Sequence, residues 1–82
     1  MRSREEIFNT VRTALIELFE LEAPSVVPEA RFNDDLEIDS IDAVDLFEHL
    51  SRTFGTKVSP REFRSVRTVQ ELIDSIERLQ TE

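Results

Sequence analysis

The chain has 82 residues, a length that fits one small domain and leaves no room for a second. It contains no cysteine, which excludes a disulfide framework, a zinc–thiolate site and a cysteine nucleophile. The longest uninterrupted apolar run has three residues, Ala14 to Ile16, so we expect neither a membrane span nor a signal-peptide core. A single domain over residues 1–82, located in the cytoplasm, is therefore predicted.

The formal charge of −8 is unevenly distributed along the chain. Residues 29–48 carry eight acids and one base, a net charge of −7, whereas residues 1–28 carry −2 and residues 49–82 carry +1. The acidic segment repels phosphate backbones and anionic lipid headgroups, which disfavours binding to nucleic acid or to a membrane surface. It favours encounter with basic protein surfaces. The alternative is a solvated acidic face that serves solubility alone.

The first helix is expected over residues 4–20, because the apolar residues there recur at helical spacing. Ser3 followed by Glu6 forms a capping box, a pairing typical of a helix N-terminus. At 100° per residue, the apolar side chains fall in one arc of about 160°, and only Ile16 lies outside it. This arc is the face that we expect to pack against the core.

A long connection is expected over residues 22–38, because Pro24 and Pro28 prevent the first helix from continuing. A loop of about 17 residues is unusually long for a compact domain, and long ordered loops are often functional. We expect Val26, Val27 and Phe32 to attach this loop to the core.

The second helix is expected over residues 40–54, with Asp39 as its N-cap and Gly55 at its C-terminal end. Two shorter signals follow it. Ser59 and Glu62 form a capping box with a proline between them, which predicts a short third helix ending near residue 64. Another box, formed by Thr68 and Glu71, opens the last helix. These elements predict an all-α fold, a small four-helix bundle with three longer helices, a short third helix and a long loop between helices 1 and 2.

The second helix carries more apolar residues than its core stripe needs. The stripe consists of five residues on one side of the helix: Ala43, Leu46, Phe47, Leu50 and Phe54. Ile41 and Val44 lie instead on the side of Ser40. Three carboxylates surround them: Asp42, Asp45 and Glu48. Exposed apolar residues ringed by charge indicate a protein contact surface. The alternative is that Ile41 packs under the long loop and Val44 is merely tolerated.

Catalysis by Ser40 is not expected, because a nucleophilic serine needs a base within hydrogen-bond reach. The only histidine, His49, is nine residues further on, which places it on the opposite side of the helix and about 13 Å along the axis. A calcium loop that begins at Asp35 would have serine where glycine is needed and Leu46 where glutamate is needed. We predict no catalytic residue and no dedicated metal site.

Residues 35–42, Asp-Leu-Glu-Ile-Asp-Ser-Ile-Asp, resemble the attachment signature of acyl carrier proteins, usually Asp-Leu-Gly-x-Asp-Ser-Leu/Ile-Asp/Glu. The resemblance covers essentially the whole chain. It includes residues 28–32 before the signature, Phe54-Gly55 at the end of the second helix, and residues 68–72 at the start of the last one. Within a small, acidic, helical domain this is a specific signal.

The resemblance implies a discrete acyl carrier protein that is not itself an enzyme. Ser40 would receive 4′-phosphopantetheine from coenzyme A through a magnesium-dependent phosphopantetheinyl transferase, and Asp39 would help to position the hydroxyl and the metal of the transferase. The arm would carry acyl intermediates as thioesters for fatty-acid, polyketide or related specialised lipid biosynthesis. The implied docking surface consists of Ile41, Asp42, Val44, Asp45 and Glu48. It would bind acyl-transferring and chain-elongating enzymes with basic docking surfaces, and the carrier would be a monomer.

Several residues depart from the pattern of the family. Glu37 stands where the family usually has glycine, which adds charge and alters the loop before the attachment site. Glu48 replaces an apolar contact, and residues 51–53, Ser-Arg-Thr, stand where housekeeping fatty-acid carriers are typically acidic. The region of the third helix is basic, with Arg61, Arg64 and Arg67. These departures favour a carrier dedicated to a specialised pathway.

Two alternatives to an acyl carrier are considered. One is a carrier-like helical module that binds proteins and is never modified. The other is a carrier of aminoacyl or peptidyl groups, which is less favoured because such carriers usually have glycines before the serine, and this chain has only Gly55. Modification of Ser40 distinguishes the first alternative from an acyl carrier.

Overall fold

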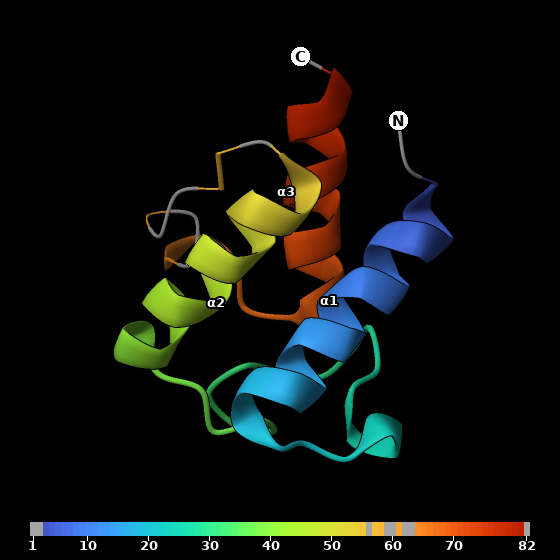
Figure 1. Cartoon of the computed structure of the whole chain (residues 1–82). Helices are drawn as coiled ribbons and strands as arrows, with labels where there is room; N and C mark the ends of the chain where they lie inside the picture. The colour runs from blue at the N-terminus through green and yellow to red at the C-terminus, as the bar shows by residue number, and fades with distance from the viewer. Residues whose placement is uncertain (1–2, 56, 59–60, 62–63, 82) are drawn as a thin grey trace.

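The protein is described by a computed structural model that covers residues 3–55, 57–58, 61 and 64–81. Within these residues lie three α-helices, α1 (Arg4–Phe19), α2 (Ser40–Phe54) and α3 (Val69–Thr81), and a short 3-10 helix, η1 (Ala23–Ser25). α1 packs against both α2 and α3. The long loop between α1 and α2 passes around one end of the three helices (Figure 1).

The all-helical fold agrees with the sequence prediction, and the number of helices is tested only in part. The three longer helices are present, whereas the short helix expected over residues 59–64 lies largely outside the described residues. Among the residues described, no helix has the length and apolar character needed to cross a membrane.

α1 begins with the predicted capping box. Ser3 Oγ accepts a hydrogen bond from the Glu6 amide at 3.2 Å, and Glu6 Oε1 accepts one from the Ser3 amide at 3.2 Å. Four residues of the predicted arc are buried: Ile7, Val11, Ala14 and Leu15. Leu18 was expected in this arc but is 39% exposed, because it lies in the last turn of the helix. Ile16 falls outside the arc and is nonetheless partly buried against the core, since α1 packs against two helices.

The loop between α1 and α2 is attached to the core by its apolar side chains. Val26 and Phe32 are buried as predicted, and three further loop residues are buried with them: Ala30, Leu36 and Ile38. The prediction for Val27 is wrong, because its side chain is 40% exposed. Val26 has extended backbone angles, and adjacent side chains on an extended backbone point to opposite sides.

The loop is also joined to the segment that leads into α3. Arg31 and Thr68 form an isolated antiparallel bridge. Three backbone hydrogen bonds accompany this bridge: Phe32 N to Arg67 O at 3.0 Å, Val69 N to Ala30 O at 3.0 Å, and Gln70 N to Pro28 O at 2.9 Å. The sequence shows no strand alternation here, so this pairing was not predicted. It fixes the loop to a segment more than thirty residues away.

The loop closes on itself before α2 begins. Ile38 N donates to Phe32 O at 2.7 Å, and Leu36 N donates to Arg31 O at 3.1 Å. Glu37 lies between these two amides with φ of 54°, in the left-handed region. Glycine adopts this region without steric cost, whereas other L-residues adopt it with strain.

α3 completes the core. Thr68 Oγ1 accepts a hydrogen bond from the Glu71 amide at 3.2 Å, as the predicted capping box requires, but Glu71 Oε1 accepts from the Arg67 amide at 3.3 Å. Leu79 is partly buried in α3. Five residues of this helix are buried: Val69, Leu72, Ile73, Ser75 and Ile76. Arg4 forms ion pairs with Asp74 and Glu77, which join the start of α1 to α3.

Phe32 should contribute strongly to stability, because its buried ring links the loop to the helices. We expect Phe32→Leu to lower the free energy of unfolding by about 1 to 1.5 kcal/mol, and Phe32→Ala by about 3 kcal/mol or more. Val27→Ala is the matched control within the same loop and should change stability by less than about 0.5 kcal/mol. Urea titrations followed by circular dichroism measure these differences. Equal losses for Phe32→Leu and Val27→Ala would show that the loop is not anchored through Phe32.

Relief of backbone strain at Glu37 should be measurable. Glu37→Gly is expected to raise the free energy of unfolding by about 0.5 to 1 kcal/mol, because glycine accepts the left-handed φ. Glu37→Val should lower it by about 1 kcal/mol or more, since a β-branched residue is disfavoured there. Thermal melts at matched pH compare the variants with wild type. A Gly variant less stable than the Val variant would contradict the strain.

Candidate functional site

Ser40 is the first residue of α2, and Asp39 is its N-cap. Asp39 Oδ1 accepts hydrogen bonds from Ile41 N at 3.0 Å and from Asp42 N at 2.9 Å. An aspartate is a favoured N-cap because its carboxylate satisfies amides that have no partner within the helix. The predicted start of the helix and its cap are therefore confirmed.

The side chain of Ser40 is exposed. In the described part of the chain, no group forms a hydrogen bond with its hydroxyl. The amide dipoles of α2 place partial positive charge at this end of the helix, which favours an attached phosphate group. Exposure, a free hydroxyl and the helix N-terminus together fit a covalently attached phosphodiester.

The loop before Ser40 is closed by a second set of polar contacts. Asp35 Oδ2 accepts from the Arg31 amide at 2.8 Å, and the Asp35 amide donates to Arg31 O at 2.9 Å. The side chain of Arg31 forms an exposed ion pair with Asp34 at 3.5 Å. With Leu36 and Ile38 buried, the signature segment alternates between core contacts and exposed polar residues. This pattern leaves Asp39 and Ser40 exposed at its end.

The left-handed backbone at Glu37 explains why glycine is usual at this position in the family that the chain resembles. Glu37 has a left-handed φ of 54° and directly precedes Ile38, which is buried and whose amide donates to Phe32 O. The glutamate thus adds an exposed negative charge near Ser40 at the cost of backbone strain.

The two apolar residues beside Ser40 are exposed, as predicted. Ile41 is 77% exposed and Val44 is 42% exposed, so the alternative in which Ile41 packs under the loop is wrong. Asp45 and Glu48 are exposed beside them, and Asp42 is half-buried.

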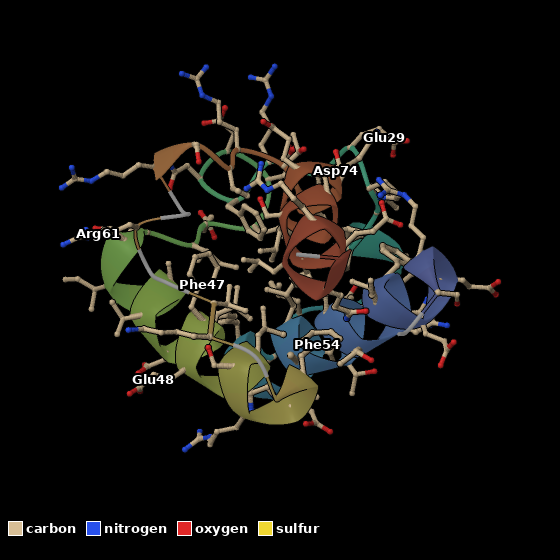
Figure 2. All side chains as sticks on the ribbon, turned by 90° about the horizontal axis from the view of Figure 1, so that it is seen from above. Glu29, Phe47, Glu48, Phe54, Arg61 and Asp74 are labelled. Atoms are coloured by element: carbon tan, nitrogen blue, oxygen red, sulfur yellow. The ribbon has the colours of Figure 1, made fainter. Side chains whose placement is uncertain are left out.

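The opposite side of α2 forms the predicted core stripe. All five of its residues are buried: Ala43, Leu46, Phe47, Leu50 and Phe54. Figure 2 shows Phe47 and Phe54 pointing into the interior and Glu48 pointing away from it. α2 therefore separates residues that hold the fold from residues that a partner can reach.

The one histidine of the chain lies far along α2 from Ser40. His49 is half-buried on α2, nine residues along the helix, as the sequence indicated. Across residues 3–55 and the other described positions, no group of three or more His, Cys, Asp or Glu residues is placed to hold a metal ion.

One polar contact near the end of α2 was not predicted. Ser51 Oγ accepts a hydrogen bond from the Val58 amide at 2.8 Å and donates one to Val58 O at 3.3 Å. The pair holds Val58 against the helix. A serine one turn before a helix end is common, so the sequence offered no specific signal for it.

Comparisons with known proteins agree with this geometry. A family model described as a phosphopantetheine attachment site matches residues 9–76. Acyl carrier protein 2 of Ralstonia nicotianae is 40% identical over 74 residues, which make up 90% of this chain and 91% of that protein. The acyl carrier protein of Thermotoga maritima is 37% identical over 78 residues, or 95% of this chain and 96% of that protein.

A solved structure of the acyl carrier protein from Enterococcus faecalis has a similar fold. Its TM-score to this chain is 0.75 at 29% identity, and the match covers 95% of this chain and 99% of that one. The family match and the relatives together cover both the signature and the helices around it. The chain therefore belongs to the acyl carrier protein family, whose members carry acyl groups on 4′-phosphopantetheine and are not enzymes.

Proposed function

We propose that Ser40 is the residue to which 4′-phosphopantetheine is attached. The observation that supports it most directly is an exposed hydroxyl, with no partner among the described residues, on the first residue of α2. When bound, the prosthetic group supplies the thiol that the chain itself lacks, and acyl groups are carried on it as thioesters.

The residues around Ser40 hold it in place for the transferase. Asp39 fixes the first turn of α2 through its two hydrogen bonds, and we propose that the same carboxylate also contacts the transferase's magnesium. The base that accepts the Ser40 proton belongs to the transferase, since His49 is too far along α2 to reach the hydroxyl.

The docking face of this carrier is proposed to consist of five residues of α2: Ile41, Asp42, Val44, Asp45 and Glu48. Its apolar part, Ile41 and Val44, is exposed and loses contact with water on binding. Its carboxylates steer the basic surfaces of the transferase and of acyl-transferring and chain-elongating enzymes.

The pathway is proposed to be a specialised one within fatty-acid, polyketide or related lipid biosynthesis, and the carrier to be a cytoplasmic monomer of one domain. Arg52 on α2 and Arg64 and Arg67 before α3 support a specialised pathway, because they are exposed cations on a chain of net charge −8.

We retain a short helix over residues 59–64 as a proposal, because Ser59 and Glu62 form a capping box in the sequence.

Attachment to Ser40 is tested by incubating the apo protein with coenzyme A and a broad-specificity phosphopantetheinyl transferase, followed by intact-protein mass spectrometry. Wild type should gain the mass of one phosphopantetheine. Ser40→Ala should gain none, and Ser25→Ala, which removes another exposed hydroxyl, should be loaded like wild type. Unmodified wild type after treatment with several transferases would favour a carrier-like binding module.

The docking face is tested with Val44→Ser and Leu46→Ala, two neighbours on α2 of which one is exposed and one buried. Val44→Ser should weaken the complex with the transferase by roughly 1 kcal/mol at any salt concentration and leave the melt nearly unchanged. Leu46→Ala should lower the free energy of unfolding by roughly 2 kcal/mol or more. Similar melting losses for both variants would place Val44 in the core.

Charge steering by the same face is tested with Asp45→Lys combined with Glu48→Lys. Loading of this variant should be slower than that of wild type, mainly through slower encounter. The difference should shrink as salt rises, because exposed charges are screened over about 10 Å at 0.1 M ionic strength. Initial rates at two salt concentrations measure it, and a salt-independent loss would contradict steering.

A further inference from the structure

The exposed face of α2 does not end at its carboxylates. At 100° per residue, Arg52 falls within about 20° of both Ile41 and Asp45 around the helix axis. Its side chain is exposed, and it lies in the last turn of α2. The face that begins with acidic residues beside Ser40 therefore ends with a cation.

A second cation is held beside Arg52. Lys57 is exposed and directly precedes Val58, whose backbone is bonded twice to Ser51 Oγ. This contact fixes Val58 against the end of α2. An open hollow of about 300 Å³ lies there, lined by Glu48, Ser51, Arg52, Lys57 and Val58. Arg52 and Lys57 thus share the wall of one surface hollow.

Neither Arg52 nor Lys57 forms an ion pair with a residue that the structure describes, although Glu48 lies one turn before Arg52. Asp42 and Arg52 are ten residues apart, which is about 15 Å along the helix. This separation exceeds the screening length of about 10 Å at 0.1 M salt, so the charges of Asp42 and Arg52 act on a partner largely independently, while Glu48 lies between them beside the hollow.

We propose that Arg52 and Lys57 form the basic end of a docking face whose other end is acidic, and that this basic end determines which enzymes accept the carrier. The inference rests on the proposed function of α2 as the docking face. A chain-elongating enzyme that uses this carrier presents basic residues to Asp42, Asp45 and Glu48, and a carboxylate to Arg52 and Lys57. An enzyme whose docking surface is basic throughout is repelled by the two cations.

Repulsion is tested by the initial rate of loading with a broad-specificity transferase whose carrier-binding surface is basic. Arg52→Glu combined with Lys57→Glu makes the face acidic throughout and should raise the rate about threefold to tenfold at about 0.05 M salt. The increase should disappear at about 0.5 M salt. Melts of each variant confirm that the bundle is folded.

The matched control is Arg12→Glu combined with Arg78→Glu, which changes the net charge by the same amount at positions on α1 and α3. This control should stay within about twofold of wild type. An equal increase for both pairs, or a decrease for the α2 pair, would overturn the proposal. Failure of wild type to be loaded on Ser40 would instead contradict the proposed attachment site.

The carboxylate of the partner is tested by carbodiimide crosslinking of the loaded carrier to each condensing enzyme of the source organism in turn. The enzyme that elongates acyl groups on this carrier should form an amide between Lys57 and one of its own Asp or Glu residues. Lys57→Arg, which keeps the charge but removes the reactive amine, should abolish that crosslink. If a functional chain-elongating enzyme forms crosslinks only to carboxylates of the carrier, and none to Lys57, the proposal is overturned.

Discussion

The exposure of Ser40 depends on the burial of the loop that precedes it. The side chains of Phe32, Leu36 and Ile38 are buried in the core. The antiparallel bridge at Arg31 joins the backbone of the loop to the segment before α3. Burial of apolar side chains stabilises the loop, and the bridge satisfies backbone groups that would otherwise lack partners. A long connection of this kind is usually mobile, but here both its ends and its middle are fixed. The serine therefore follows a segment that is packed and hydrogen-bonded, while its own hydroxyl has no partner among the described residues.

α2 carries buried core residues on one side and large exposed apolar residues on the other. Its core stripe holds the bundle together, and its other face exposes Ile41 and Val44 to water. Exposure of large apolar residues lowers solubility unless charged residues surround them, and here the neighbouring carboxylates do so. Part of the negative charge thus lies beside exposed apolar surface, on Asp42, Asp45 and Glu48. The core stripe and the exposed apolar residues thus lie on different sides of one helix, and we expect a substitution on the exposed side to leave the stability of the bundle nearly unchanged.

The sequence predicted the three longer helices and the cap before Ser40 well, because both depend on local patterns. The capping box at Ser3, the N-cap at Asp39 and the left-handed Gly55 are read from neighbouring residues, and the structure contains all three. Contacts between distant segments leave no such pattern. The pairing of Arg31 with Thr68 and the partial burial of Ile16 depend on how elements meet in three dimensions. The exposure of Val27 has the same origin, since an apolar side chain in a loop is buried only if the backbone turns it inward.

We infer that the loop and its cap present Ser40, and no other hydroxyl, for attachment of the prosthetic group. Trypsin cleaves after Arg31 and Arg52 and releases a peptide of residues 32–52 that contains two serines, Ser40 and Ser51. Tandem mass spectrometry of this peptide from the loaded protein assigns the modified residue directly. We expect the phosphopantetheine on Ser40 alone, because the Ser51 hydroxyl is half-buried and bonded to Val58. Modification of Ser51, or of a serine outside this peptide, would contradict the account.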